Sequence, residues 1–182
     1  MNCSTTGDDN DEDDSIAASN PEVCQTNTKS LALLAYFVWL SASQLEEIDF
    51  QLMEQYLADG ADINAATEMG ATILHDVASN WDRTVAEFLF ERGANIHAVN
   101  SSGQTPLHLA ASTDHIEMVR WLLEKGAHLD AMTSEELQSP IHYAARNDSL
   151  ESLQVLIENG GKEFFFISSS VNMGLWHLYY RG

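Results

Sequence analysis

Seven histidines are the residues of this chain that most directly suggest chemistry, because imidazole rings serve as metal ligands and as general bases. A zinc site needs about four ligands that converge on one centre. His75, His108 and His142 instead recur at intervals of 33 and 34 residues, each within a similar local sequence. Similar segments in a row would place these rings side by side along the molecule. We therefore predict no metal site and assign the three histidines a structural role.

Covalent catalysis requires a nucleophile that is held within hydrogen-bond distance of a base. Cys24 lies in a polar N-terminal stretch, and the chain contains no Gly-x-Ser-x-Gly segment. The phosphate-binding patterns Gly-x-Gly-x-x-Gly and Gly-x-x-x-x-Gly-Lys-Ser/Thr are absent as well. We predict that the protein is not an enzyme and that it uses no cofactor.

The net charge of the chain indicates which kinds of partner it can bind. With 28 acidic and 8 basic residues, the formal net charge is -20. Nucleic-acid binding depends on clustered lysine and arginine, so this charge argues against nucleic acid as a partner. It favours a partner protein with a basic patch. Cys3 and Cys24 form neither a disulfide framework nor a paired metal motif, so we expect a cytoplasmic protein, with a nuclear location left open.

The stretch from Gly103 to Ala131 carries the signals of two short helices. Thr105 can cap a helix, and Pro106 then takes the first helical position, where a missing N–H costs nothing. A second apolar stripe begins at Ile116, and Gly126 supplies the left-handed residue that ends it. The pattern predicts two antiparallel helices joined by a tight connection.

Copies of this helical pair occur on both sides of it. The segment Thr105 to His108 recurs as Thr72 to His75, 33 residues earlier, and as Ser139 to His142, 34 residues later. The Gly-Ala terminator of the second helix recurs in step at Gly93 and at Gly60. Isolated helices shorter than about 12 to 15 residues are marginal, so the copies must stack on one another to bury their apolar faces.

These features resemble the ankyrin-repeat family, whose repeat has this length and this Thr-Pro-Leu-His start. The resemblance covers residues from about Leu45 to Gly161. It implies an all-α solenoid of helix-loop-helix units joined by hairpin-like loops, in which the repeated histidine bonds to the backbone and steadies the loop. It implies no reaction.

The chain divides into three parts. Residues 1–30 form an acidic stretch that we expect to be disordered, and residues 31–163 form a domain of about four repeats, of which the first is degenerate. Within that domain, Leu31 to Leu40 is apolar without a break, and Ser30 could cap it as a helix that closes the N-terminal end of the stack. Residues 164–182 form an irregular, aromatic-rich tail. Either this tail folds back over the fourth repeat or it is the end of a longer array.

The resemblance also implies which residues contact a partner. Such contacts usually come from the loop tips and from the two residues after the paired alanines of each inner helix. We prefer Trp81, Tyr143 and Arg146 as anchors, because aromatic and arginine side chains dominate binding energies. Packing against the adjacent repeat is the competing interpretation for Trp81 and Tyr143. The expected contact residues are Glu68, Met69, Ser79, Asn80, Trp81, Ser101, Ser102, Gln104, Ser112, Thr113, Glu135, Glu136, Tyr143, Arg146 and Asn147, with Ala71 and Gln138 at further loop-tip positions.

The sequence therefore predicts a soluble, monomeric scaffold that binds another protein on the concave face and loop tips of an ankyrin stack. The alternative is the cytosolic ankyrin portion of a larger membrane protein, since such arrays also occur in transient receptor potential channels and palmitoyltransferases. We expect no direct membrane insertion, because Leu31 to Leu40 is far shorter than the roughly 20 apolar residues of a spanning helix. A poorly folded fragment is a third possibility.

Overall fold

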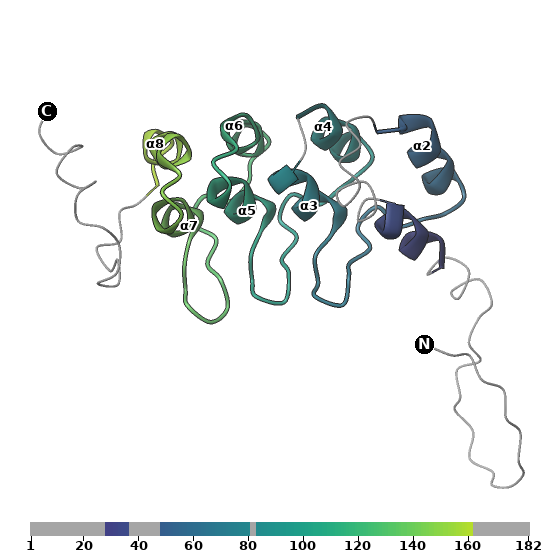
Figure 1. Ribbon diagram of the computed structural model, residues 1–182, viewed down its shortest axis with the longest axis horizontal. Coiled ribbons are helices and arrows are strands. Elements are labelled where there is room, and N and C mark those ends of the chain that lie inside the picture. Colours follow the sequence, from purple (N-terminus) through teal and green to yellow (C-terminus); the bar gives the residue numbers. More distant parts are fainter. Residues whose placement is uncertain (1–27, 37–47, 81–82, 162–182) are drawn as a thin grey trace, which may run out of the picture.

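The computed structural model describes residues 28–36, 48–80 and 83–161 of the chain (Figure 1). Within these ranges the regular elements are helices, and extended pairing is limited to an isolated antiparallel bridge between Ala66 and Thr72. The predicted all-α solenoid is confirmed. Besides a helical segment at 28–36, the helices are α2 (Phe50–Ala58), α3 (Ile73–Asn80), α4 (Arg83–Glu91), α5 (Pro106–Ser112), α6 (Ile116–Glu124), α7 (Pro140–Arg146) and α8 (Leu150–Glu158).

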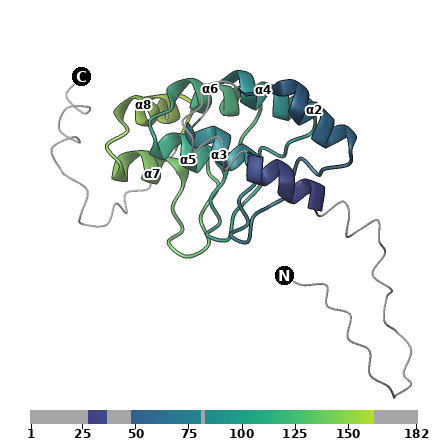
Figure 2. The ribbon, with the colours of Figure 1, turned by 45° about the vertical axis from the view of Figure 1, so that its right-hand side comes forward.

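The helices lie in two rows. Helices α3, α5 and α7 form an inner row from which the long loops project, and α2, α4, α6 and α8 form an outer row behind it (Figures 1 and 2). The helical segment 28–36 lies beside α3 at the end of the inner row in both views. Each inner helix therefore has an outer partner, as a stack of helical pairs requires.

The helices begin where their local sequence predicts. Thr105 and Ser139 have extended backbones directly before α5 and α7, each of which opens with a proline. Asp49 caps α2, because its carboxylate accepts the N–H groups of Gln51 at 2.9 Å and Leu52 at 3.1 Å. Gly126 follows α6 with a φ of 91°, a conformation that favours glycine and turns the chain toward the next loop.

The core runs along the stack and has no single centre. Small side chains line the inner row, where Ala78, Ala110 and Ala144 are fully buried and let neighbouring helices approach closely. Larger side chains fill the space between the two rows. The largest fully buried apolar ones are Leu33, Met53, Ile73, Leu74, Leu89, Leu107, Met118, Trp121, Leu122 and Leu156.

The N-terminal helical segment corrects one detail of the prediction. The helix covers residues 28–36, so Ser30 lies inside it and does not cap it. The Ser30 hydroxyl instead accepts the N–H of Asp62 at 2.9 Å, which ties the segment to the first repeat. Leu33 and Leu34 are buried, whereas Leu31 is 54% exposed. The segment thus covers the end of the stack with one face, and residues 37–40 lie outside the described ranges.

Several predictions concern parts of the chain that the structure does not describe. Residues 1–27 and 162–182 are among them, so the predictions for the acidic N-terminal stretch and the aromatic-rich tail remain predictions. The same holds for the domain boundaries. No helix in the described ranges is long and apolar enough to cross a membrane.

Candidate functional site

Three hairpin-like loops project from the inner row, and we call them the second finger (64–72), the third finger (97–105) and the fourth finger (130–139). In each finger a backbone hydrogen bond joins the two arms near the tip. The N–H of Thr67 donates to Ala71 at 2.9 Å, that of Asn100 to Gln104 at 3.0 Å and that of Thr133 to Gln138 at 2.9 Å. The fingers are therefore ordered, repeated units.

Neighbouring fingers are also bonded to one another. The N–H of Ser101 donates to the carbonyl of Met69 at 2.9 Å, and that of Ser134 donates to Ser102 at 3.0 Å. Gly103 makes the second contact possible, because a Cβ at this residue would lie 2.5 Å from the backbone nitrogen of Ser134. The three fingers consequently form one continuous layer.

A row of histidines anchors the base of this layer. Nδ1 of His108 accepts the N–H of Thr105 at 3.1 Å, and Nε2 lies 3.0 Å from the carbonyl of Gln138 in the next repeat. Because Nδ1 accepts, Nε2 carries the proton and donates. His75 makes the same two contacts, with Thr72 at 3.1 Å and with Gln104 at 3.0 Å. The backbone bonds implied by the resemblance are therefore present.

The fourth repeat repeats only half of this arrangement. Nδ1 of His142 accepts the N–H of Ser139 at 3.2 Å, and Nε2 has no hydrogen-bond partner among the described residues. Burial lowers the pKa of His142, and it also lowers the pKa of His75 and His108. The lowered pKa values favour the neutral rings, which the acceptor role of Nδ1 requires.

The structure exposes most of the predicted contact residues. The finger tips present Glu68, Met69, Ser101, Ser102, Glu135 and Glu136 to solvent, with Ala71, Gln104 and Gln138 half-buried. At the ends of the inner helices, Asn80, Thr113, Arg146 and Asn147 are exposed, and Ser79 and Ser112 are half-buried. Trp81 lies outside the described residues.

Tyr143 and Arg146 are engaged within the protein. The Tyr143 hydroxyl accepts a hydrogen bond from Gln104 Nε2 at 2.9 Å, and its ring meets His108 edge-on at 5.2 Å. The guanidinium of Arg146 lies 5.1 Å from the Tyr143 ring and 3.4 Å from the carboxylate of Glu136. Tyr143 is 8% exposed, so its packing agrees with the competing interpretation. Its use as a direct anchor stays a prediction, whereas Arg146 remains accessible.

The sequence-based prediction did not include Leu137, the most exposed large apolar residue of the fourth finger. Leu137 is 68% exposed and has a φ of 50°. It occupies the place that Gly70 and Gly103 hold in the other fingers. This departure is visible in the sequence and could have identified the residue.

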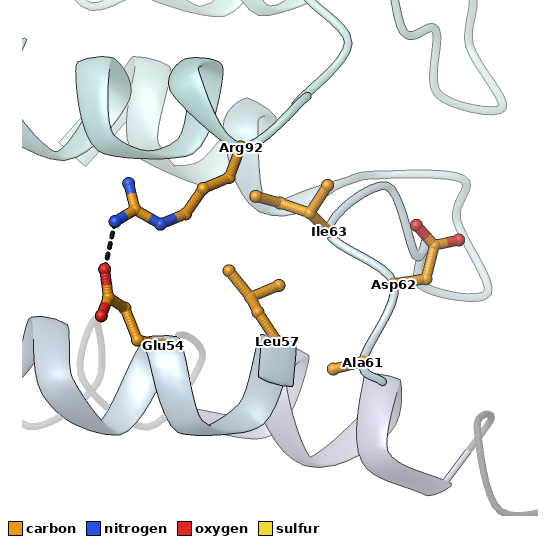
Figure 3. A pocket seen from close by; sticks show the side chains of 6 residues that line it. All are labelled: Glu54, Leu57, Ala61, Asp62, Ile63 and Arg92. Carbon is orange, nitrogen blue, oxygen red and sulfur yellow. Dashed lines mark hydrogen bonds and ion pairs between the residues drawn. The ribbon is translucent and has the colours of Figure 1, made fainter. Parts of the chain in front are cut away.

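A shallow groove of about 510 Å³ lies on the outer side, between α2 and the residues after α4 (Figure 3). Its one cationic side chain, Arg92, forms an ion pair with Glu54 and lies over the ring of Phe88 at 3.4 Å. The one positive charge of the groove is thus already paired, and the carboxylate of Asp62 gives the lining a net negative charge. It is lined by Glu54, Leu57, Ala61, Asp62, Ile63 and Arg92, a set without a nucleophile paired to a base.

Within the described ranges, no group of three or more His, Cys, Asp or Glu residues could hold a metal ion. His97 and His128 do lie together, with ring centroids 4.2 Å apart and planes inclined by 28°. This is a stacking contact between two repeats. The arrangement offers packing and hydrogen bonding, not a coordination centre.

Comparison with known proteins agrees with this architecture. A family model described as ankyrin repeats (3 copies) matches residues 39–133 and 74–166, which together cover more than half of the chain. A search of curated proteins finds no match. Ankyrin repeats are generally protein–protein interaction modules, and proteins built from them are typically non-enzymatic. The chain belongs to the ankyrin-repeat family.

Proposed function

We propose that this protein is a monomeric, cytoplasmic scaffold that binds a partner protein with the tips of its fingers and the adjoining ends of its inner helices. The observation that supports this proposal is the bonded layer of fingers. Backbone groups near the tips form bonds within and between fingers, and the side chains at the tips of all three fingers are exposed. The side chains of such a surface are therefore available for recognition of a partner.

Rigid display is the mechanism of this function. Bonds between neighbouring fingers and the histidines at their base hold the tips in place before a partner arrives. A partner that docks on an ordered surface loses less conformational entropy than one that must order the loops first. The affinity therefore depends mainly on the side chains at the tips.

The charge of the fingers favours a basic partner. The tips carry Glu68, Glu135 and Glu136, and the three fingers contain no lysine or arginine. Arg146 of α7 lies beside Glu136, with 3.4 Å between its guanidinium and the carboxylate. Complementary charge raises the rate of association and the selectivity for basic partners.

A charge-reversal experiment tests this proposal. Glu68→Lys, Glu135→Lys and Glu136→Lys together should abolish most capture of partner proteins from a cell lysate, measured by quantitative mass spectrometry. The matched control is Glu117→Lys, Glu151→Lys and Glu158→Lys, which changes the net charge equally on exposed residues of the outer row. Equal capture by the two triple variants would contradict binding through the fingers.

A further inference from the structure

Leu137 has a backbone conformation that its side chain disfavours. In the described residues, three residues other than glycine have positive φ values: Asp114 at 56°, Asp148 at 57° and Leu137 at 50°. Aspartate tolerates this region because its short side chain can bond locally, whereas a leucine there is uncommon and strained. The cost is about 1 to 2 kcal/mol.

Burial does not offset this strain. The side chain of Leu137 is 68% exposed, so it contributes little to the core of the described structure. A glycine, as in the second and third fingers, would remove the strain and the exposed apolar surface together. A strained and exposed apolar residue points to a use outside the folding of the chain.

The position of Leu137 also affects the edge of the finger layer. At the equivalent Gly103, a Cβ would lie 2.5 Å from the nitrogen of Ser134 in the next finger, and at Gly70 it would lie 3.0 Å from the nitrogen of Ser101. A leucine at this place therefore cannot accept another finger in the same register. No further finger follows the fourth one in the described ranges, and Leu137 places an apolar side chain where the other fingers contact a neighbour.

A second exposed apolar side chain lies two repeats away. Met69 at the tip of the second finger is 66% exposed. Two other exposed apolar side chains, Val99 at 59% and Met132 at 40%, precede the closing bonds of the third and fourth fingers and so lie on the arms, not at the tips. Between Met69 and Leu137 lies the third finger, whose tip has the small residues Ser101 and Ser102. Neighbouring helices lie about 8 to 10 Å apart, so two repeat spacings amount to roughly 16 to 20 Å. An extended chain covers that length with about five or six residues, at roughly 3.3 Å each.

We propose that the finger tips bind one extended segment of a partner protein, a statement that rests on the proposed function. The segment carries two apolar side chains about five or six residues apart, which contact Met69 and Leu137, and lysine or arginine between them. Those basic residues contact Glu68, Glu135 and Glu136, while the serines of the third finger leave room for the backbone. The charges and the two apolar residues thus specify the same class of ligand.

A displayed library of random peptides, long enough to span the three fingers, is the probe for this proposal. Selection on the full chain should enrich peptides with two apolar residues at the stated spacing and basic residues between them. Leu137→Gly should weaken these peptides by at least about tenfold in fluorescence polarisation, as removal of an interface anchor does. Leu150→Ala, which truncates a leucine of α8 that is 43% exposed, should leave their affinity unchanged.

Other outcomes overturn the proposal. The proposal is overturned if the selected peptides bind the Leu137→Gly variant as tightly as they bind the natural chain. Leu137→Asn provides a second test of the same point, because asparagine tolerates positive φ. Peptides that depend on Asn80 and Arg146 but not on Leu137 would leave the proposed partner binding intact and reject this surface. Enrichment of no peptide at all would reject the extended segment, and partner capture from lysate would then decide separately whether the scaffold function stands.

Discussion

The third and fourth repeats share one motif but differ in their surroundings. His108 of the third repeat is fully buried and bonded through both ring nitrogens, whereas His142 of the fourth is half-buried and bonded through Nδ1 alone within the described residues. Gly103 of the third finger lies against the fourth finger, and Leu137 at the same place is exposed. The comparison shows that the motif is buried and fully hydrogen-bonded where a repeat lies on both sides of it. In the fourth repeat, which no further repeat follows in the described ranges, part of the motif stays exposed.

The largest effect that would test this comparison is expected for His108→Ala. The substitution leaves the buried N–H of Thr105 and the carbonyl of Gln138 without their partner and opens a cavity. We expect a loss of about 3 to 5 kcal/mol in the free energy of unfolding, measured by urea denaturation followed by circular dichroism. The matched variant His142→Ala removes one such bond and should cost about 1 kcal/mol. Equal losses would mean that the neighbour on the far side does not matter.

Alanine substitutions at two glycines, one at the contact between fingers and one away from it, separate the effect of that contact from the effect of backbone conformation. Gly103→Ala combines a positive φ of 77° with a Cβ that lies 2.5 Å from Ser134 N, and should destabilise the fold by about 3 kcal/mol. Gly60→Ala also has a positive φ, 94°, but its Cβ meets nothing within 4 Å, so its loss should be about 1 kcal/mol. Thermal unfolding measures both variants. Similar losses would show that backbone conformation alone explains the glycines.

The histidine row makes stability depend on pH. Burial lowers the pKa of His75, His108 and His142, so below pH of about 6.5 the unfolded chain binds protons before the folded protein does. The free energy of unfolding should be highest above that pH and fall as the pH decreases toward the lowered pKa values. Urea denaturation between neutral and mildly acidic pH checks this direction. His142→Gln should show a shallower decrease, and a stability that rises on acidification would contradict the assignment.

The smallest expected effect is a gain in stability. Leu137→Gly relieves the left-handed leucine, offset in part by the greater entropy of glycine in the unfolded chain, so the net gain should be about 0.5 to 1 kcal/mol. The midpoint of thermal unfolding should rise accordingly. Glycine at Asp148, which has a φ of 57°, serves as a control with little gain, because aspartate already tolerates this region. A clear loss of stability in Leu137→Gly would mean that the leucine is part of the fold.

Much of the fold could be predicted because its signals are local. The starts at Thr72, Thr105 and Ser139, of which the last two are followed by proline, and the Gly-Ala ends set the helix boundaries through capping, the fixed φ of proline and the freedom of glycine. Their common spacing then predicted the stack, since such short helices cannot bury their apolar faces alone. The N-terminal helix was located less well. Its apolar run contains no unique start, and contacts of Leu33, Leu34 and Ser30 with the first repeat determine how it lies.

The candidate site could be predicted less completely. The finger-tip positions were implied by the resemblance to ankyrin repeats, and the structure exposes most of them. Tyr143 illustrates the limit, because its type suggests an anchor while its hydroxyl bonds to Gln104 of the preceding repeat, 39 residues away. Such contacts depend on how two repeats meet. Neither the composition nor the spacing of residues along the chain indicates that Tyr143 and Gln104 lie within hydrogen-bond distance.

The amino-acid sequence by itself determined the repeated helical pairs, their order and the acidic character of the finger tips, because these depend on residue type and short-range spacing. The tertiary structure alone decided which residues at equivalent repeat positions are buried between repeats and which are exposed. The physical reason is that burial and hydrogen-bond satisfaction depend on the adjacent repeat: His108 has a neighbour for each ring nitrogen, and Leu137 has no neighbouring finger in the described structure to cover it.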